Sequence, residues 1–247
     1  MKPYTEFLVN TVFEAATLLT DDFFVAAKDQ SGDLVTSFDF ELERFITAKI
    51  RNHFPKFDII SEEFNPKQTL TSNCFVIDPL DGTINFAHGL PLFGIQVAMV
   101  KRGKTISSVI YLPRLRELYF ADECGAFLVE DPTQSNITKN AHRIRVSSTA
   151  PDKALYLVEG GDKFAALARL DKKTRHWRYI CCTAVNHAWT ARGRLGGTIL
   201  RKDNLWDYLP GQYLVKQAGG HITNKKGAHV AANTKAMAKM LLQEGRL

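Results

Sequence analysis

The sequence predicts a layered α/β fold in two halves that meet near residue 145. Apolar residues at helical spacing occur near the start of the chain, which favours helices there. The middle of the chain has apolar runs separated by turn residues, which is typical of an antiparallel sheet. After about residue 150, short strand-like runs alternate with helical ones. Together these patterns predict helices layered against sheets.

The first half, residues 1–145, is expected to begin with two helices. Residues 6–19 place apolar side chains on one helical face, and a second helix is expected from about Asp39. Short strands are expected to follow at 57–61 and 75–78. An antiparallel meander and one further strand complete this half, at 93–100, 105–112, 117–121 and 142–147.

The second half, residues 146–247, alternates strands and helices. Strands are expected at 154–158, 176–180 and 196–200, and helices at 162–170, 183–192 and 207–217. Gly193 is well placed to end one of these helices, because glycine readily adopts the left-handed conformation that closes a helix. A last helix is expected from about residue 234, and the two halves are expected to form a single compact unit.

The composition excludes several classes of protein. With 247 residues, 45% hydrophobic and 23% charged, the chain is expected to be globular and not disordered. The longest stretch without Asp, Glu, Lys or Arg, residues 82–100, contains a proline and three glycines, so we expect no membrane span. We find no signal-peptide pattern and expect a cytosolic protein with reduced cysteines. The net charge of +6 is dispersed, which favours a solvated surface over a nucleic-acid patch.

The sharpest motif is Asp78-Pro79-Leu80-Asp81-Gly82-Thr83, between a predicted strand and a predicted helical turn. Two carboxylates around a rigid proline turn are expected to converge, and they would repel each other unless a cation lay between them. Gly82 lets the backbone approach a ligand, and Thr83 places a hydroxyl where the turn begins. Oxygen donors with no His or Cys nearby indicate Mg²⁺ or Mn²⁺. The alternative is an ordinary turn with surface acids.

Three further acids lie where strands end or helices begin. Glu62 follows a short strand, Asp207 opens a helix after Trp206, and Asp39 heads the second predicted helix. Each of them alone also suits a solvated strand end or a helix cap. Added to the central motif, they strengthen the case for a metal site.

These residues, in their order along the chain, resemble the inositol monophosphatase family of lithium-sensitive, magnesium-dependent phosphatases. The resemblance covers nearly the whole chain, and the central motif, DPLDGTINF at 78–86, is very specific. The other segments that carry it are 33–36 with Asp39 and Glu43, 61–63, and Trp206-Asp207 with 218–220.

The resemblance implies a five-layer αβαβα sandwich and a phosphomonoesterase with two or three Mg²⁺ ions. Metal ligation would come from Glu62, Asp78, the carbonyl of Leu80, Asp81 and Asp207. Thr83 and Asp39 would orient a water for in-line attack, with Glu62 also in the catalytic set. The substrate would contact Asp81, Gly82, Thr83, Thr183 and Asp207. A small phosphorylated substrate, an inositol 1-phosphate-like alcohol, and a homodimer are also implied.

Two departures from the family pattern concern the alcohol half of the substrate. Leu200, followed by Arg201-Lys202, stands where many inositol-cleaving members carry an acidic residue. Cys181-Cys182 replaces a small Gly-Ser or Gly-Thr pair beside Thr183. A sugar bisphosphate, histidinol phosphate or nucleotide 3′-phosphate is therefore an alternative substrate. The alternative of another class is a binding protein associated with transcription or ribosome assembly.

Overall fold

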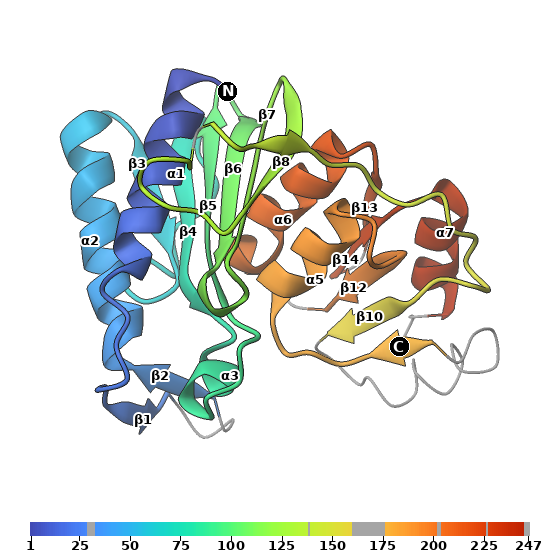
Figure 1. Ribbon diagram of the computed structural model, residues 1–247, viewed down its shortest axis with the longest axis horizontal. Helices are drawn as coiled ribbons and strands as arrows, with labels where there is room; N and C mark the ends of the chain where they lie inside the picture. Colours follow the sequence, from blue (N-terminus) through green and yellow to red (C-terminus); the bar gives the residue numbers. More distant parts are fainter. Residues whose placement is uncertain (29–32, 138, 160–175, 202–203, 226, 245–247) are drawn as a thin grey trace.

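The structure is a computed structural model that describes every residue except 29–32, 138, 160–175, 202–203, 226 and 245–247. Its elements form five layers, in the order helices, sheet, helices, sheet, helix (Figure 1). The expected five-layer αβαβα sandwich is therefore confirmed. The predicted helix at 162–170 lies outside the described residues.

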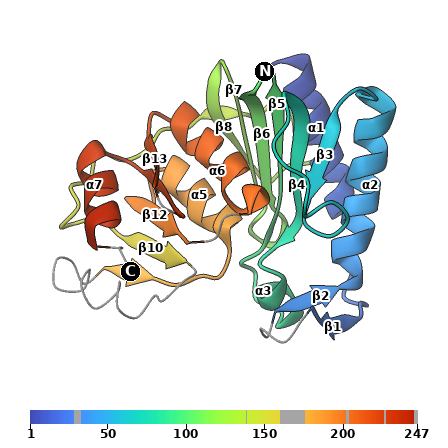
Figure 2. The same ribbon diagram turned by 180° about the vertical axis from the view of Figure 1, so that it is seen from behind.

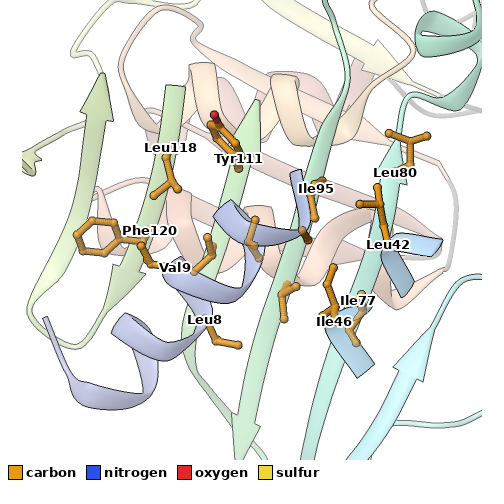
Figure 3. Close-up of a cluster of buried hydrophobic side chains, with 14 of the residues drawn as sticks. Leu8, Val9, Leu42, Ile46, Ile77, Leu80, Ile95, Tyr111, Leu118 and Phe120 are labelled. Carbon is orange, nitrogen blue, oxygen red and sulfur yellow. The ribbon is translucent and has the colours of Figure 1, made fainter. Parts of the chain in front are cut away.

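The first helical layer consists of α1 (Pro3–Ala16) and α2 (Ser37–His53), which cover one face of a seven-stranded sheet. In that sheet β3 and β4 are parallel and all other neighbours are antiparallel. Figure 3 shows apolar side chains of both helices packed against the strands. In sheet order the strands are β3 (Asp58–Ser61), β4 (Asn73–Asp81), β5 (Gly94–Lys101), β6 (Lys104–Leu112), β7 (Glu117–Asp122), β8 (Gly125–Glu130) and β9 (His142–Arg143).

The central helical layer consists of α5 (Thr183–Ala191) and α6 (Leu205–Gln217), which lie between the two sheets (Figure 2). They share one buried cluster with strands β6, β7 and β8 of the first half. The second sheet follows, covered on its outer face by α7 (Lys235–Glu244). Its strands, in sheet order, are β11 (Trp177–Arg178), β10 (Tyr156–Glu159), β12 (Gly197–Leu200), β14 (Ala228–Ala232) and β13 (His221–Lys225).

Three short elements lie together at one end of the first half. The hairpin strands β1 (Val25–Ala27) and β2 (Leu34–Thr36) are antiparallel, and β2 contacts the short helix α3 (Thr83–Ala87). Figure 1 shows this group below the large sheet. The group therefore borders the chain segment that follows β4.

Several predicted boundaries are wrong. The helix predicted at 6–19 spans Pro3–Ala16, because a proline suits the first helical turn, where a backbone N–H is not required. The strand predicted at 142–147 has only two residues, and β1, β2, β8, β13 and β14 were not predicted. Gly193 follows the C-terminal end of α5 and has φ +82°, as expected for a residue that ends a helix. The boundary near residue 145 stays a prediction.

No helix among the described residues is long and apolar enough to cross a membrane. All four cysteines are free thiols; Cys74 and Cys182 are buried, Cys181 is half-buried and Cys124 is exposed.

Candidate active site

A β-bulge at the end of β4 brings two carboxylates to the same face of the sheet. Ile77 and Leu80 point into the core under α1 and α2, as Figure 3 shows. Residues three apart in a regular strand face opposite sides, so Asp78 and Asp81 would diverge without an extra residue. The pairing of β4 with β5 shifts between Asp78 and Asp81, and Pro79 lies within this bulge. The predicted turn is therefore a bulged strand end.

The first turn of α6 supplies a third carboxylate, that of Asp207. One oxygen each from Asp78, Asp81 and Asp207 lies within 4.8 Å of the other two, and all three residues are buried. The Asn204 amide donates to Asp207 Oδ2 at 3.1 Å, which fixes that side chain at the start of the helix. The bulged strand and α6 therefore build one acidic cluster.

The charge of this cluster is poorly compensated by protein groups. Burial raises the pKa of Asp78 well above its usual value, and repulsion from Glu62, Asp81 and Asp207 adds to this. Asp78 Oδ1 is buried and has no hydrogen-bond partner among the residues that the structure describes. Burial also raises the pKa of Asp81. An orphaned carboxylate oxygen among convergent carboxylates fits a divalent cation, because hard cations are bound by oxygen atoms.

Asp81 is also tied to the start of α5. Its Oδ2 accepts hydrogen bonds from the Thr183 hydroxyl at 2.8 Å and from the Ala184 backbone N–H. The side chain of Gln96 in β5 donates to Thr183 Oγ1 at 3.1 Å and reaches Asp78 and Asp81 at 3.4 Å. These contacts hold the position of Asp81, and within the described part of the chain its other oxygen makes no side-chain or backbone hydrogen bond.

A cysteine lies closer to the acids than expected. Cys182 Sγ is 3.5 Å from Asp81 Oδ2, so the expectation of no Cys near the oxygen donors is wrong. Burial, with repulsion from the nearby acids, raises the pKa of Cys182 well above its usual value. The residue is therefore a neutral thiol, and a thiol binds metals far less well than a thiolate.

Glu62 approaches the cluster from the turn after β3. Glu43 of α2 holds this turn, because its carboxylate accepts hydrogen bonds from the Ser61 hydroxyl and from the backbone N–H groups of Glu63 and Phe64. Lys28 Nζ lies 2.8 Å from Glu62 Oε1 and also contacts Glu63. Burial raises the pKa of Glu63 to about 7 in spite of this contact.

Thr83 and Asp39 are joined by a hydrogen bond. The Thr83 hydroxyl lies 3.0 Å from Asp39 Oδ1 and 2.9 Å from the Leu80 carbonyl, and its single hydrogen serves one of them at a time. Asp39 Oδ2 accepts from the backbone N–H and the hydroxyl of Thr36, which closes the capping box of α2. Asp39 is thus both a helix cap and a partner of Thr83, and burial raises its pKa.

One pocket of about 200 Å³ contains most of the predicted site. Asp39 does not line it but reaches it through Thr83. Leu200 is 1% exposed in β12 and does not line the pocket. The predicted residues that line it are Glu62, Asp78, Leu80, Asp81, Gly82, Thr83, Thr183 and Asp207.

Two polar residues in or beside the pocket were missed. Gln96 is a lone amide in an apolar strand, a pattern that could have been noticed because buried amides need partners. No sequence pattern predicts that Lys28 lies at the pocket, since its partners Glu62 and Glu63 are distant in sequence.

Comparison with known proteins decides the family. A family model described as the inositol monophosphatase family matches residues 1–245. The chain belongs to the inositol monophosphatase family. The fold and the order of the acidic motifs agree with this membership.

Relatives within this family carry different names. A Thermotoga maritima protein named fructose-1,6-bisphosphatase/inositol-1-monophosphatase is 36% identical over 211 residues, which is 82% of this chain and 76% of that protein. Nus factor SuhB of Escherichia coli (strain K12) is 30% identical over a 266-residue alignment, covering 98% of this chain and 95% of that protein. A solved Thermotoga maritima IMPase structure matches with a TM-score of 0.83 at 28% identity, covering 99% of this chain and 98% of that one. The family identifies this chain as a phosphatase, and the acidic cluster agrees with metal dependence.

Proposed function

We propose that this phosphatase is a Mg²⁺-dependent phosphomonoesterase that hydrolyses a small phosphorylated alcohol. The observation that carries the proposal is the cluster of Asp78, Asp81 and Asp207, with its oxygen atoms within 4.8 Å and one of them orphaned. Membership of the inositol monophosphatase family supports the same reaction.

The metal ligands proposed are the carboxylates of Asp78, Asp81, Asp207 and Glu62 and the carbonyl of Leu80. With Asp33, five carboxylates line the pocket, and Lys28 is the only cationic side chain among its described lining residues, so the pocket would repel a phosphate dianion without additional positive charge. When bound, Mg²⁺ neutralises the phosphate oxygens and makes water more acidic. Two or three ions, with Mn²⁺ as a substitute, satisfy this charge balance.

The proposed catalytic group is the Thr83 hydroxyl, with Asp39 behind it. When Thr83 donates its hydrogen to Asp39, the lone pairs of its oxygen are available to accept a hydrogen bond from water. Asp39 stays in place because Thr36 holds its other oxygen. Glu62 faces the same pocket and is proposed to orient the water from the opposite side. This arrangement aims the water at the phosphorus of a substrate that contacts Asp81, Gly82, Thr83, Thr183 and Asp207.

Phosphate release from a panel of phosphomonoesters, with Mg²⁺ and with or without Li⁺, tests the proposal. The panel includes myo-inositol 1-phosphate, a sugar bisphosphate, histidinol phosphate and a nucleotide 3′-phosphate. The variant Asp81→Asn should lower kcat by at least 100-fold, because a ligand charge is lost. Its amide oxygen still accepts from Thr183 and Ala184, so the fold should persist.

Asp58→Asn is the matched control, because Asp58 is an exposed carboxylate at the start of β3, outside the pocket. We expect activity close to that of the unchanged chain in this variant. Turnover at the unchanged rate in Asp81→Asn would rule out the metal assignment.

A second candidate function rests on the relatives named Nus factor SuhB. We propose association with transcription machinery only as a role beside catalysis, because the pocket keeps its complete set of acids. A chain that releases no phosphate from any ester would make this the leading candidate. We also propose that the protein is cytosolic and that it forms a homodimer. Light scattering after gel filtration tests the homodimer.

A further inference from the structure

The mouth of the active pocket differs in character from its acidic floor. The mouth includes two aliphatic side chains, an aromatic ring and a polarisable thiol: Leu34 of β2, Ile84 of α3, Tyr179 and Cys181. Ile84 is 38% exposed and Tyr179 is 41% exposed. Single exposed apolar residues are common, but several that converge on one pocket indicate a ligand surface.

The segment between β11 and α5 holds Tyr179 and Cys181 at this mouth in a strained form. Cys181 has φ +57°, a left-handed conformation that residues with a side chain rarely adopt. Strained backbone of this kind persists where the surroundings enforce it, and it is found most often at functional sites. Directly behind, Cys182 is fully buried against Asp81 and Gly82. The fold therefore fixes a soft, polarisable wall beside the ring of Tyr179.

Around the mouth, the charged side chains among the described lining residues are those of Asp33 and Lys28, outside the acidic cluster. Leu200 is buried and paired with Glu159 and His229 in the second sheet, so it offers no acceptor to the pocket. The Lys28 ammonium, also at the mouth, is occupied by Glu62 and Glu63. Against Leu34 and Ile84, the hydroxyl groups of a cyclic polyol would lose hydrogen bonds to water without regaining them, which is unfavourable.

We propose that the alcohol half of the substrate carries a planar ring with an apolar face, which binds against Tyr179 and Ile84 at the pocket mouth. The inference rests on the proposed phosphomonoesterase function and names the class of its substrate: the phosphate ester of an alcohol that bears an aromatic or heteroaromatic ring. Tyr179 supplies an aromatic face, and Ile84 supplies an apolar contact in the same pocket.

The test compares two primary alkyl phosphates, 2-phenylethyl phosphate and glycerol 3-phosphate, in the presence of Mg²⁺. The ring-bearing ester should have a kcat/KM about tenfold higher, the usual size of an aromatic contact together with its buried area. Tyr179→Ala should lower kcat/KM about tenfold for 2-phenylethyl phosphate, mainly through KM, and about twofold at most for glycerol 3-phosphate. Tyr179→Phe should retain the preference.

Leu90→Ala is the matched control, because Leu90 is an apolar residue, 48% exposed, that does not line this pocket. It should change neither ester. Equal kcat/KM values for the two esters in the unchanged chain, or equal losses on both in Tyr179→Ala, would overturn the inference.

Calorimetric binding of 2-phenylethylphosphonate and propylphosphonate, with Mg²⁺, separates this inference from the proposed function. If no ester is hydrolysed, the phosphatase proposal fails. The ratio of the two phosphonate affinities still shows whether the pocket prefers a ring. Binding of the phenyl compound about tenfold tighter than the propyl compound, reduced in Tyr179→Ala, supports the inference. Equal binding of the two compounds refutes it.

Discussion

Thr83→Ala separates a catalytic hydroxyl from a structural one. Gly82, in a left-handed conformation, is the N-cap residue of α3, so Thr83 does not cap that helix. The substitution removes only the hydrogen bond that Thr83 shares between Asp39 and the Leu80 carbonyl. The structural and catalytic consequences of the change can therefore be estimated separately.

The structural cost should be small. Loss of one hydrogen bond from a half-buried hydroxyl costs about 1 kcal/mol of unfolding free energy. For a chain of 247 residues this corresponds to a fall in Tm of about 2–4 °C. Asp39 keeps its two hydrogen bonds from Thr36, so the start of α2 should be preserved.

The catalytic cost should be large. A positioned group that transfers or orients a proton contributes about 10²–10⁴-fold, so kcat should fall at least 100-fold while KM changes little. The assay is phosphate release at saturating Mg²⁺, with differential scanning fluorimetry on the same samples. Thr83→Ser, which retains the hydroxyl, should recover most of kcat. A Tm fall of several degrees with kcat unchanged would refute the catalytic role.

Three further predictions concern Lys28, Gly211 and His187. Lys28→Met should tighten Mg²⁺ binding several-fold by titration calorimetry, because Glu62 loses its competing ammonium; weaker binding would contradict this. Gly211→Ala should lower the unfolding free energy by about 1–3 kcal/mol in urea, because a Cβ there would lie 2.2 Å from His187 Cγ; a stabilised variant would contradict it. Burial lowers the pKa of His187 to about 4. As pH falls from 6.5 towards 4, the unfolded chain binds a proton that the folded chain excludes. This should cost about 2 kcal/mol of stability at pH 5. His187→Gln should remove this part of the loss between pH 7 and 5, and an unchanged slope of stability against pH would count against it.

The acids of the site were predictable because their motifs are local in sequence. Asp78 and Asp81 lie in one short run whose residue types and spacing indicate a metal site, whereas Asp207 alone also suits a helix cap and was selected with the help of the family resemblance. Many helices and strands were predictable for a similar reason, since helical and strand periodicities are properties of single segments, whereas the five-layer order was implied by the family resemblance. The boundary errors occur mainly at short strands such as β9, whose pairing depends on distant partners.

The local geometry was not predictable in the same way. A bulge at Pro79 reverses which face each residue occupies, and its presence depends on the register with β5. The contact of Lys28 with Glu62 and the contact of Gln96 with Thr183 join segments far apart in the chain. Such pairs become visible only when the layers are assembled.

The buried cluster shared by β6–β8 with α5 and α6 has a consequence for mutations far from the pocket. Asp78 and Asp81 are carried by β4, which belongs to the same sheet as β6–β8, and Asp207 is carried by α6. A change in the volume of a core side chain such as Leu112 or Leu214 would slide the helix over the sheet and alter the spacing of the carboxylates. Substrate affinity and metal affinity in natural variants should therefore vary with residues that no ligand touches. Substitutions in this packing interface can change both affinities without any change in the pocket lining.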